Sequence, residues 1–238
     1  MLSILIPIRD EIENIDNIVQ KFDDNLKNIQ YEVIFVNDFS VDNTFQKTEK
    51  ICKMKENYKV YNNQKKGLGG ALNLGIEKAN GKYICIMMAD LSDDIDDLKK
   101  YFKKITEKNL DAVFGSRFMN SSRVHDYPIN KLILNRIFNL FVKLIFLKDY
   151  NDFTNAFKIY KSDVLKNLTP FFSESFNIFL EIPLKIINRD YSYEVVPINW
   201  YNRKKGKAKF NIKELKSKYI STLIRCFLEK ILLNKKIK

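Results

Sequence analysis

The first half of the chain alternates short apolar runs with helix-like stretches, and no other feature limits its fold as strongly. The apolar runs cover residues 2–8, 31–36, 59–61, 82–88 and 111–114. Such alternation favours strands that lie mostly parallel in one sheet, with the connecting helices packed on its two faces. We therefore expect an α/β fold with a mostly parallel central sheet.

Polar residues gather directly after three of these runs. Asp10 and Glu11 follow the first run, Asp38 follows the second, and Asp90 follows the run that ends at residue 88. In a parallel α/β sheet the ligand site lies at the carboxyl ends of the strands. The three clusters should therefore converge on one edge of the sheet.

Asp90 is the best-placed carboxylate for a divalent metal ion, because it stands at the end of an apolar strand. Asp93 and Asp94 follow closely, and hard cations such as Mg²⁺ prefer oxygen ligands. The same segment has a structural explanation, since Ser92, Asp93 and Asp94 could simply cap a helix that begins near Ile95, with Asp93 or Ser92 expected at the cap. The two roles are compatible, with Asp90 in the site and a neighbour at the cap.

A glycine-rich turn at residues 67–71 precedes another helix-like stretch. Glycines let two backbones or a ligand approach closely, and the amino end of a helix attracts phosphate. The turn matches neither a Walker loop nor a full dinucleotide-binding motif. An ordinary tight turn is an equal alternative.

The second half of the chain opens with an apolar helix, predicted over residues 129–147 after Pro128, a helix-starting residue. The polar residues within it are Lys131, Asn135, Arg136, Asn139 and Lys143. Four of them recur at a spacing of four and form a narrow polar stripe. Because a bilayer span needs about 20 apolar residues, this interrupted helix should lie at a membrane interface or pack deeply in the protein.

Nearly all of the net positive charge lies in the C-terminal segment. The chain has 41 Lys and Arg against 29 Asp and Glu, and residues 203–238 contribute thirteen basic against two acidic residues, or +11 of the total +12. Apolar residues recur there at helical spacing, which predicts a basic amphipathic helix over 211–238. Such a helix can lie among anionic lipid headgroups, at about 1 kcal/mol for each nearby basic residue. Nucleic-acid binding is the weakest alternative, because no recognised binding motif is present.

The remaining features favour a water-soluble cytoplasmic domain. Hydrophobic residues make up 45% of the chain and charged residues 29%, as in ordinary globular proteins. Three scattered cysteines favour a reducing compartment, and the N-terminus shows no secretory leader. We expect the chain to bind a membrane peripherally or through an anchoring partner protein.

Two isolated residues leave alternatives open. Glu181 lies in an apolar stretch and is either a site carboxylate or a partly exposed helix residue before a proline-bent segment. His125 is the only histidine, so no histidine-centred metal site exists. As a lone loop residue it is expected to be solvated rather than catalytic.

Several short motifs follow one another in a specific order and spacing from residue 2 to about 210. They lie at residues 4–15, 36–44, 67–71, 79–83, 88–92, 115–117, 152–157 and 194–198, followed by Arg203, Gly206 and Lys209. Together they resemble family-two glycosyltransferases of GT-A fold, and the dolichyl-phosphate mannosyltransferase-like group of polyprenyl-phosphate glycosyltransferases matches best. The resemblance implies a GT-A domain over 1–210, with a nucleotide-sugar-binding half at 1–118 and an acceptor half at 119–210, before the helix at 211–238.

The resemblance also implies roles for individual residues. Those that would bind the nucleotide-sugar are Pro7, Glu11, Asp38 and Asp90, and we expect Gly69 of the glycine turn to bind it with them. Arg117 and Lys131 fall where the family has basic contacts to the acceptor phosphate, and we expect Arg136 to bind this phosphate with them. Asp90 and Arg203 would be catalytic, and Asp90 and Asp94 would hold Mg²⁺ or Mn²⁺.

The chain departs from the family pattern in two places. Asn37 and Phe39 flank Asp38 where the family usually has an aspartate and a glycine, and Met88 stands where the family usually has the first aspartate of an Asp-x-Asp motif. The loss of one carboxylate removes a metal ligand. It predicts a weaker metal site, or one completed by Asp94 and by oxygens of the donor.

A phosphate monoester suits this site as acceptor, because it needs no strong base. Its second pKa is about 6, so it is largely dianionic at neutral pH. Alignment, metal neutralisation and basic clamps can then suffice, and a single in-line displacement inverts the anomeric carbon. The leading expectation is sugar transfer from GDP-mannose or a UDP-sugar to dolichyl or undecaprenyl phosphate at the cytoplasmic membrane face. The alternatives are the same donor chemistry on a non-lipid glycan, and a nucleotide-sugar- or lipid-binding protein that has lost catalysis.

Overall fold

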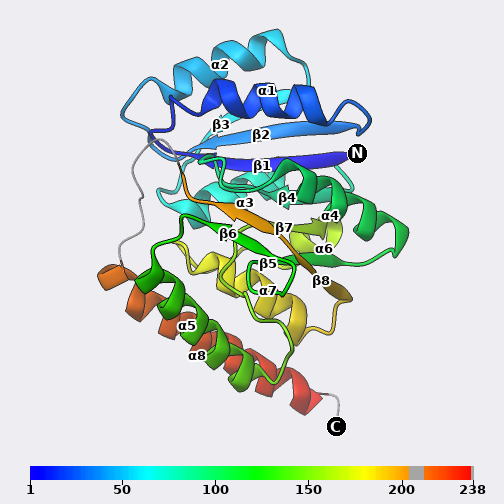
Figure 1. Ribbon diagram of the computed structural model, residues 1–238, viewed down its shortest axis with the longest axis vertical. Helices are drawn as coiled ribbons and strands as arrows, with labels where there is room; N and C mark the ends of the chain where they lie inside the picture. Colours follow the sequence, from blue (N-terminus) through cyan, green and yellow to red (C-terminus); the bar gives the residue numbers. More distant parts are fainter. Residues whose placement is uncertain (204–211, 237–238) are drawn as a thin grey trace.

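The computed structural model describes residues 1–203 and 212–236, and its main feature is a seven-stranded sheet in the order β3-β2-β1-β4-β7-β5-β8 (Figure 1). The strands of this sheet are β1 (Leu2–Ile8), β2 (Tyr31–Asn37), β3 (Tyr58–Asn62), β4 (Tyr83–Ile86), β5 (Ala112–Ser116), β7 (Lys158–Lys161) and β8 (Tyr193–Pro197). All neighbouring pairs are parallel except those of β7, which is antiparallel to both β4 and β5. The predicted α/β fold with a mostly parallel sheet is confirmed.

Helices cover both faces of the sheet. They are α1 (Ile15–Asn25), α2 (Thr44–Met54), α3 (Leu68–Lys78), α4 (Ile95–Glu107), α5 (Ile129–Phe146), α6 (Ser162–Asn167), α7 (Ile178–Asn188) and α8 (Ile212–Lys236). Side chains of α1 and α4 join one buried apolar cluster, and those of α3, α6 and α7 join a second. Strand β2 contributes Val33 and Phe35 to the first cluster and Ile34 and Val36 to the second, as the two-residue period of a strand requires.

The strand predicted over 82–88 is shorter than expected, because β4 ends at Ile86. The backbone N–H of Met87 still donates to the Leu5 carbonyl at 3.0 Å, but that of Met88 donates to the Asp93 carboxylate at 3.3 Å. This side chain replaces a neighbouring strand as hydrogen-bond partner. The chain therefore leaves the sheet just before Asp90.

A two-stranded ribbon brings residues 199–203 back to the end of β4. Strand β6 (Arg123–His125) pairs in parallel with β9 (Asn199–Tyr201). The backbone N–H of Tyr201 also donates to the Ser92 carbonyl at 3.0 Å. Because Arg203 follows two residues later, these bonds bring it close to the segment that contains Asp90.

Helices α5 and α8 lie side by side at the end of the molecule opposite α2 (Figure 1). The Phe138 and Tyr219 ring centroids are 5.4 Å apart, and those of Phe146 and Phe227 are 6.2 Å apart. The helix predicted over 129–147 ends one residue early, because Leu147 adopts a left-handed conformation with φ of 53°. None of the helices in the described ranges combines the length and apolarity that crossing a bilayer requires.

The predicted boundary between residues 210 and 211 lies outside the described residues, as do Gly206 and Lys209. Strands β7 and β8 come from the predicted acceptor half, yet they belong to the same sheet as β1–β5. The division of the GT-A domain at residue 118 stays a prediction.

Candidate active site

Asp38 lies just after β2 and is nearly buried. Its Oδ1 accepts hydrogen bonds from the backbone N–H of Gly67 (2.7 Å) and from the side-chain amide of Asn63 (2.8 Å). Its Oδ2 lies 3.9 Å from Nη1 of Arg9. One carboxylate thus joins the ends of β1, β2 and β3 to the glycine turn.

Arg203 brings together carboxylates that follow two other strand ends. Its Nη2 donates to Oδ2 of Asp90 at 2.7 Å, and its Nη1 lies 3.7 Å from Oε1 of Glu11. The predicted convergence of polar clusters on one sheet edge is confirmed. Pro7 lies within β1, opposite Val36 of β2, and is buried at the same edge.

Asp94 is the N-cap of α4, where its Oδ1 accepts from the backbone N–H of Asp96 at 2.9 Å. The sequence predicted a cap within residues 92–94, which is confirmed, but its choice of Ser92 or Asp93 for that cap was wrong. Ser92 instead donates its backbone N–H and hydroxyl to Oδ1 of Asp90. Asp93 is buried, and burial together with the charge of Asp90 raises its pKa to about 7.

The residues at this edge fit a divalent cation only with help from a ligand. Among the residues that the structure describes, no group of three or more His, Cys, Asp or Glu side chains is arranged to hold a metal ion. Asp90 supplies one hard carboxylate, and Met88 has no oxygen in its side chain. Mg²⁺ is commonly bound by one or two carboxylates plus substrate phosphates, so this donor set is compatible with Mg²⁺ or Mn²⁺. Metal binding by Asp94 stays a prediction.

The glycine turn is packed tightly against another part of the chain. Gly67 has a φ of 115°, which other residues rarely adopt. A Cβ at Gly69 would lie 1.8 Å from the Ser173 carbonyl oxygen, and the Gly69 N–H donates to the Glu174 carbonyl at 3.1 Å. The backbone conformation at Gly67 and the close backbone contact at Gly69 account for a glycine at each position. Nucleotide binding by Gly69 stays a prediction.

Arg117 follows β5 and forms a buried ion pair with Asp152. Its Nε donates to Oδ2 at 2.8 Å and its Nη2 to Oδ1 at 2.7 Å. Burial disfavours the charge on Arg117, but the carboxylate outweighs burial and raises the pKa of Arg117. Nearby, the fully buried Lys158 donates to the carbonyls of Phe153 and Asn155, and burial lowers the pKa of Lys158 to about 7.

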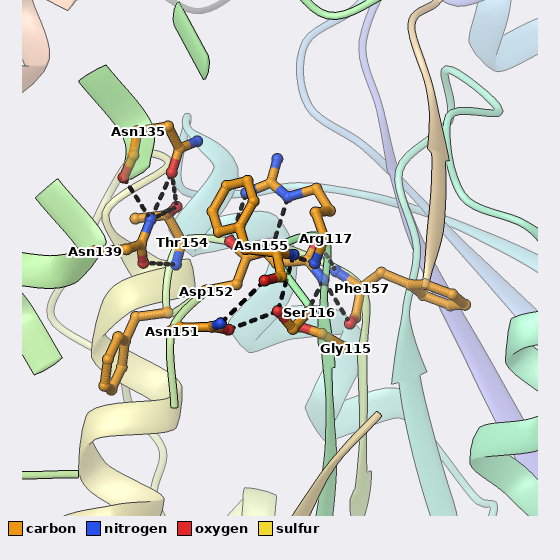
Figure 2. Close-up of polar contacts among 12 residues, drawn as sticks. Gly115, Ser116, Arg117, Asn135, Asn139, Asn151, Asp152, Thr154, Asn155 and Phe157 are labelled. Carbon is orange, nitrogen blue, oxygen red and sulfur yellow. Dashed lines mark hydrogen bonds and ion pairs between the residues drawn. The ribbon is translucent and has the colours of Figure 1, made fainter. Parts of the chain in front are cut away.

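Figure 2 shows how α5 is attached to the loop that contains Asp152. The Asn139 amide donates to the Thr154 hydroxyl at 3.1 Å, and the Thr154 backbone N–H donates to Asn139 Oδ1 at 3.3 Å. The Thr154 hydroxyl donates to Asn135 Oδ1 at 3.0 Å. The middle of the predicted polar stripe therefore faces the protein.

The opposite side of α5 presents apolar side chains to solvent, and the neighbouring helix α8 also exposes apolar side chains. We call this surface the outward apolar face. It comprises Ile129, Ile133, Leu134, Ile137, Leu140, Phe141 and Leu144 of α5, with Ile220, Ile224, Phe227, Leu228, Ile231 and Leu232 of α8. A surface helix of a globular protein normally turns its apolar residues to the core. A large exposed apolar surface of this kind marks a contact with a membrane or a protein.

The two arginines predicted to bind the acceptor phosphate meet at one aromatic ring. The guanidinium carbons of Arg117 and Arg136 lie 5.3 Å and 5.7 Å from the centroid of Phe118. A hollow of about 240 Å³ opens beside them, lined by Phe118, Arg136, Ile137, Leu140, Lys143 and Asn151. Lys131 is exposed in the first turn of α5. Phosphate binding by the three basic residues stays a prediction.

Glu181 has a structural role in the fold. It is fully buried, accepts from the backbone N–H groups of Phe172 (3.2 Å) and Ser173 (2.9 Å), and lies 3.0 Å from Lys185. These contacts favour the helix residue over a site carboxylate, but the partial exposure predicted for it was wrong, because the carboxylate is enclosed by its hydrogen-bond partners. His125 stacks on Tyr201 with ring centroids 4.6 Å apart.

Sequence reasoning missed Asn63 and Asp152 as partners of Asp38 and Arg117. Asp152 begins one of the matching motifs, so its importance could have been suspected, although not its partner 35 residues away. For Asn63 the only signal is its place after a predicted strand.

The fold places the chain in a known class of proteins. It matches crystal structures of glucosyl-3-phosphoglycerate synthase from Mycobacterium tuberculosis, for instance one in complex with Mn²⁺, UDP and glucosyl-3-phosphoglycerate. That match has a TM-score of 0.69 at 14% identity and covers 95% of this chain and 79% of the other. A second structure, in complex with Mg²⁺ and UDP, matches equally well. The architecture is the GT-A fold of glycosyltransferases.

The chain belongs to glycosyl transferase family 2, whose model matches residues 3–169. It is 27% identical over 219 residues to a dolichol-phosphate mannosyltransferase of Pyrococcus furiosus, covering 90% of this chain and 60% of that protein. It is 26% identical over 215 residues to a dolichyl-phosphate beta-glucosyltransferase of Saccharomyces cerevisiae, covering 82% of this chain and 64% of that protein. The chain thus spans less than two thirds of the length of these relatives.

Proposed function

We propose that the chain is an inverting glycosyltransferase that moves a sugar from a nucleotide-sugar to a polyprenyl phosphate at a membrane surface. The observation that carries the proposal is the orientation of α5. Its asparagines bind the loop that contains Asp152, the partner of Arg117, and its apolar residues face outward. A lipid-linked phosphate combines an anion for the basic residues with an apolar chain for the outward apolar face. Family membership and the names of both relatives support the same substrate class.

The donor would lie across the carboxyl ends of β1 to β4. Pro7, Glu11 and Asp38 would contact its base and ribose, and Gly69 would lie near them. Asp90 would hold Mg²⁺ or Mn²⁺ together with the donor diphosphate. The metal would neutralise the charge that grows on the diphosphate as it leaves. The proposed donor is GDP-mannose or a UDP-sugar.

In the reaction, an oxygen of the acceptor phosphate forms a bond to the anomeric carbon as the bond to the β-phosphate oxygen breaks. The nucleoside diphosphate leaves with the electron pair. No base is needed, because the attacking phosphate is largely dianionic at neutral pH. Arg203 would donate hydrogen bonds to the leaving diphosphate, while Arg117, Lys131 and Arg136 hold the attacking phosphate. A single in-line displacement gives inversion.

The proposed location is the cytoplasmic face of a membrane, with peripheral attachment. Three basic residues of α8, Lys218, Arg225 and Lys230, accompany its exposed apolar residues. This composition supports binding to anionic lipid. A membrane-anchoring partner protein is compatible with the same face, and no nucleic acid is required.

A second candidate keeps the donor chemistry but uses a non-lipid acceptor. It is supported by the structural similarity to an enzyme crystallised with glucosyl-3-phosphoglycerate. Under this alternative the outward apolar face would pack against protein. The third candidate, a binding protein without turnover, is supported by Met88 and Asn37 in place of family aspartates.

The test is transfer of radiolabelled sugar from a panel of nucleotide-sugars to short-chain polyprenyl phosphate in detergent, with and without Mg²⁺ or Mn²⁺. Asp90→Ala is expected to abolish the lipid-linked product. Asp96→Ala, which removes an exposed carboxylate of α4, is the matched control and should retain activity. Product without dependence on Asp90 would contradict the assigned site. Nucleotide-sugar binding without product from any donor would exclude the lipid-phosphate acceptor and favour the other candidates.

A further inference from the structure

The glycine turn at the donor edge rests against the segment 171–175. The Gly69 N–H donates to the Glu174 carbonyl at 3.1 Å, and a Cβ on Gly69 would lie 1.8 Å from the Ser173 oxygen. The two backbones are therefore in direct contact. The same turn donates the Gly67 N–H to Asp38 at 2.7 Å. A shift of Ser173 must move the turn, and with it a partner of Asp38.

Segment 171–175 is itself held from two further sides. On one side, the Glu181 carboxylate accepts the N–H groups of Phe172 and Ser173. On the other, Asn73 of α3 exchanges two hydrogen bonds with the backbone of Phe171, at 2.9 Å and 3.2 Å. These bonds bind the segment to α7 and α3, so it moves only together with its supports.

The third support of the segment is Thr222 of α8, which is fully buried. The Asn177 amide donates both to the Thr222 hydroxyl (2.9 Å) and to the Ser173 hydroxyl (2.8 Å), and the two hydroxyls are 3.4 Å apart. Lys218, one turn earlier in α8, donates to the Ser175 hydroxyl at 3.1 Å. A continuous set of hydrogen bonds and packed backbone thus runs from α8 through Ser173 to the glycine turn.

The outer side of the same helix is apolar and exposed. Ile220 and Ile224, which flank Thr222 in the sequence at a distance of two residues, are 56% and 55% exposed. When these side chains enter a lipid surface, α8 settles where their burial is most favourable. Close-packed interiors transmit such displacements rather than absorb them.

We propose that Thr222 is a positioning residue that couples the seating of α8 on a lipid surface to nucleotide binding at the donor edge. The inference rests on the proposed function and deepens it, because it makes donor binding depend on the membrane. A nucleotide then binds more tightly to the lipid-bound protein than to the free protein. By linkage, the nucleotide strengthens vesicle binding by the same factor.

The experiment measures the Kd of UDP and of GDP, each with MnCl₂, in the presence and absence of vesicles of phosphatidylcholine and phosphatidylglycerol. Couplings of this kind are typically about 5-fold to 150-fold, so vesicles should lower the wild-type Kd by at least about fivefold. Thr222→Val keeps the shape of the side chain but loses its hydroxyl. It should sediment with vesicles like the wild type, and its Kd for the nucleotide should be the same with and without vesicles.

Thr106→Val is the matched control. Thr106 of α4 also donates its hydroxyl to the carbonyl four residues earlier in its helix, as Thr222 does, but it is exposed. This variant should keep the full vesicle effect. Should Thr222→Val fail to fold by circular dichroism, Ser173→Ala removes the other hydroxyl of the pair and should abolish the vesicle effect in its place.

The outcomes separate the two proposals. A wild-type Kd that vesicles do not change, or a vesicle effect that survives both Thr222→Val and Ser173→Ala, overturns the coupling while leaving the glycosyltransferase proposal intact. Failure of the wild type to bind either nucleotide overturns the proposed function and the coupling with it. A vesicle effect lost in the Thr222 variant and kept in the Thr106 variant supports the coupling.

Discussion

Replacing Ile137 and Leu144 with asparagine removes two apolar side chains from the outward apolar face of α5. They are 60% and 62% exposed and lie two turns apart on one side of the helix. Full burial of such a side chain is worth about 1.5–3 kcal/mol. Scaled by the exposed fractions, each contributes about 0.9–1.9 kcal/mol on entering lipid, or about 1.8–3.7 kcal/mol together, so the double variant should bind vesicles about 20-fold to 500-fold more weakly.

The assay is co-sedimentation with vesicles that contain phosphatidylglycerol, followed as a function of lipid concentration. Both side chains project largely into solvent, so circular dichroism and thermal unfolding should match the wild type. Met54→Asn is the matched control, since Met54 is 75% exposed at the end of α2, at the opposite end of the molecule (Figure 1). It should bind vesicles as the wild type does. A double variant that binds as tightly as the wild type would refute the assignment of this face to lipid.

Four further predictions concern single charged residues. Arg136→Ala, at an exposed position on α5, should raise the acceptor KM about tenfold in initial-rate measurements because one charge-assisted phosphate contact is lost; a lowered kcat with unchanged KM would argue against acceptor binding. Arg117→Ala should lower the free energy of unfolding by about 3–5 kcal/mol in urea titrations, since it leaves the buried Asp152 without its partner; an unchanged midpoint would contradict the ion pair. Arg203→Lys should reduce kcat about 100-fold in single-turnover assays. A lysine lacks the planar fork with which Arg203 contacts both Asp90 and Glu11 and with which it is proposed to contact the diphosphate; full activity would exclude that role. The pKa of Lys158 is about 7 in the folded protein and about 10.4 in the unfolded chain, so between these pH values the unfolded chain binds one more proton. The free energy of unfolding should therefore rise with pH above about 7, by up to about 1.4 kcal/mol per pH unit relative to Lys158→Met. Urea denaturation of both proteins at several pH values measures this difference, and an equal pH dependence of the two would contradict it.

The local pattern of the chain was enough to predict the sheet and its ligand edge. Apolar runs of strand length separated by helices leave few arrangements other than a parallel sheet covered on both faces. Since the carboxyl ends of such strands meet at one edge, Glu11, Asp38 and Asp90 had to converge there. The structure confirms that convergence through Arg203 and through the hydrogen bonds of Asp38.

Other features depended on contacts between distant segments. Strand β7 was not predicted, because it is a short run flanked by lysines whose antiparallel partners, β4 and β5, come from much earlier in the chain. The resemblance predicted that Arg203 lies near the diphosphate, but its ion pair with Asp90 spans 113 residues. The cap of α4 was misplaced because three adjacent residues can all accept hydrogen bonds, and only the course of the backbone selects Asp94.

In helix α5, the local sequence defines two faces, whereas contacts with a distant loop define their surroundings. The spacing of its polar residues determined that the helix has a polar stripe and an apolar remainder. It left open which side faces the protein, because periodicity defines faces but not their surroundings. The tertiary structure decided this by bringing Thr154 beside Asn135 and Asn139, so that polar groups of the loop are satisfied by the stripe. Because buried polar groups must be hydrogen-bonded, the stripe turned inward, and the apolar side chains of α5 were left on the surface.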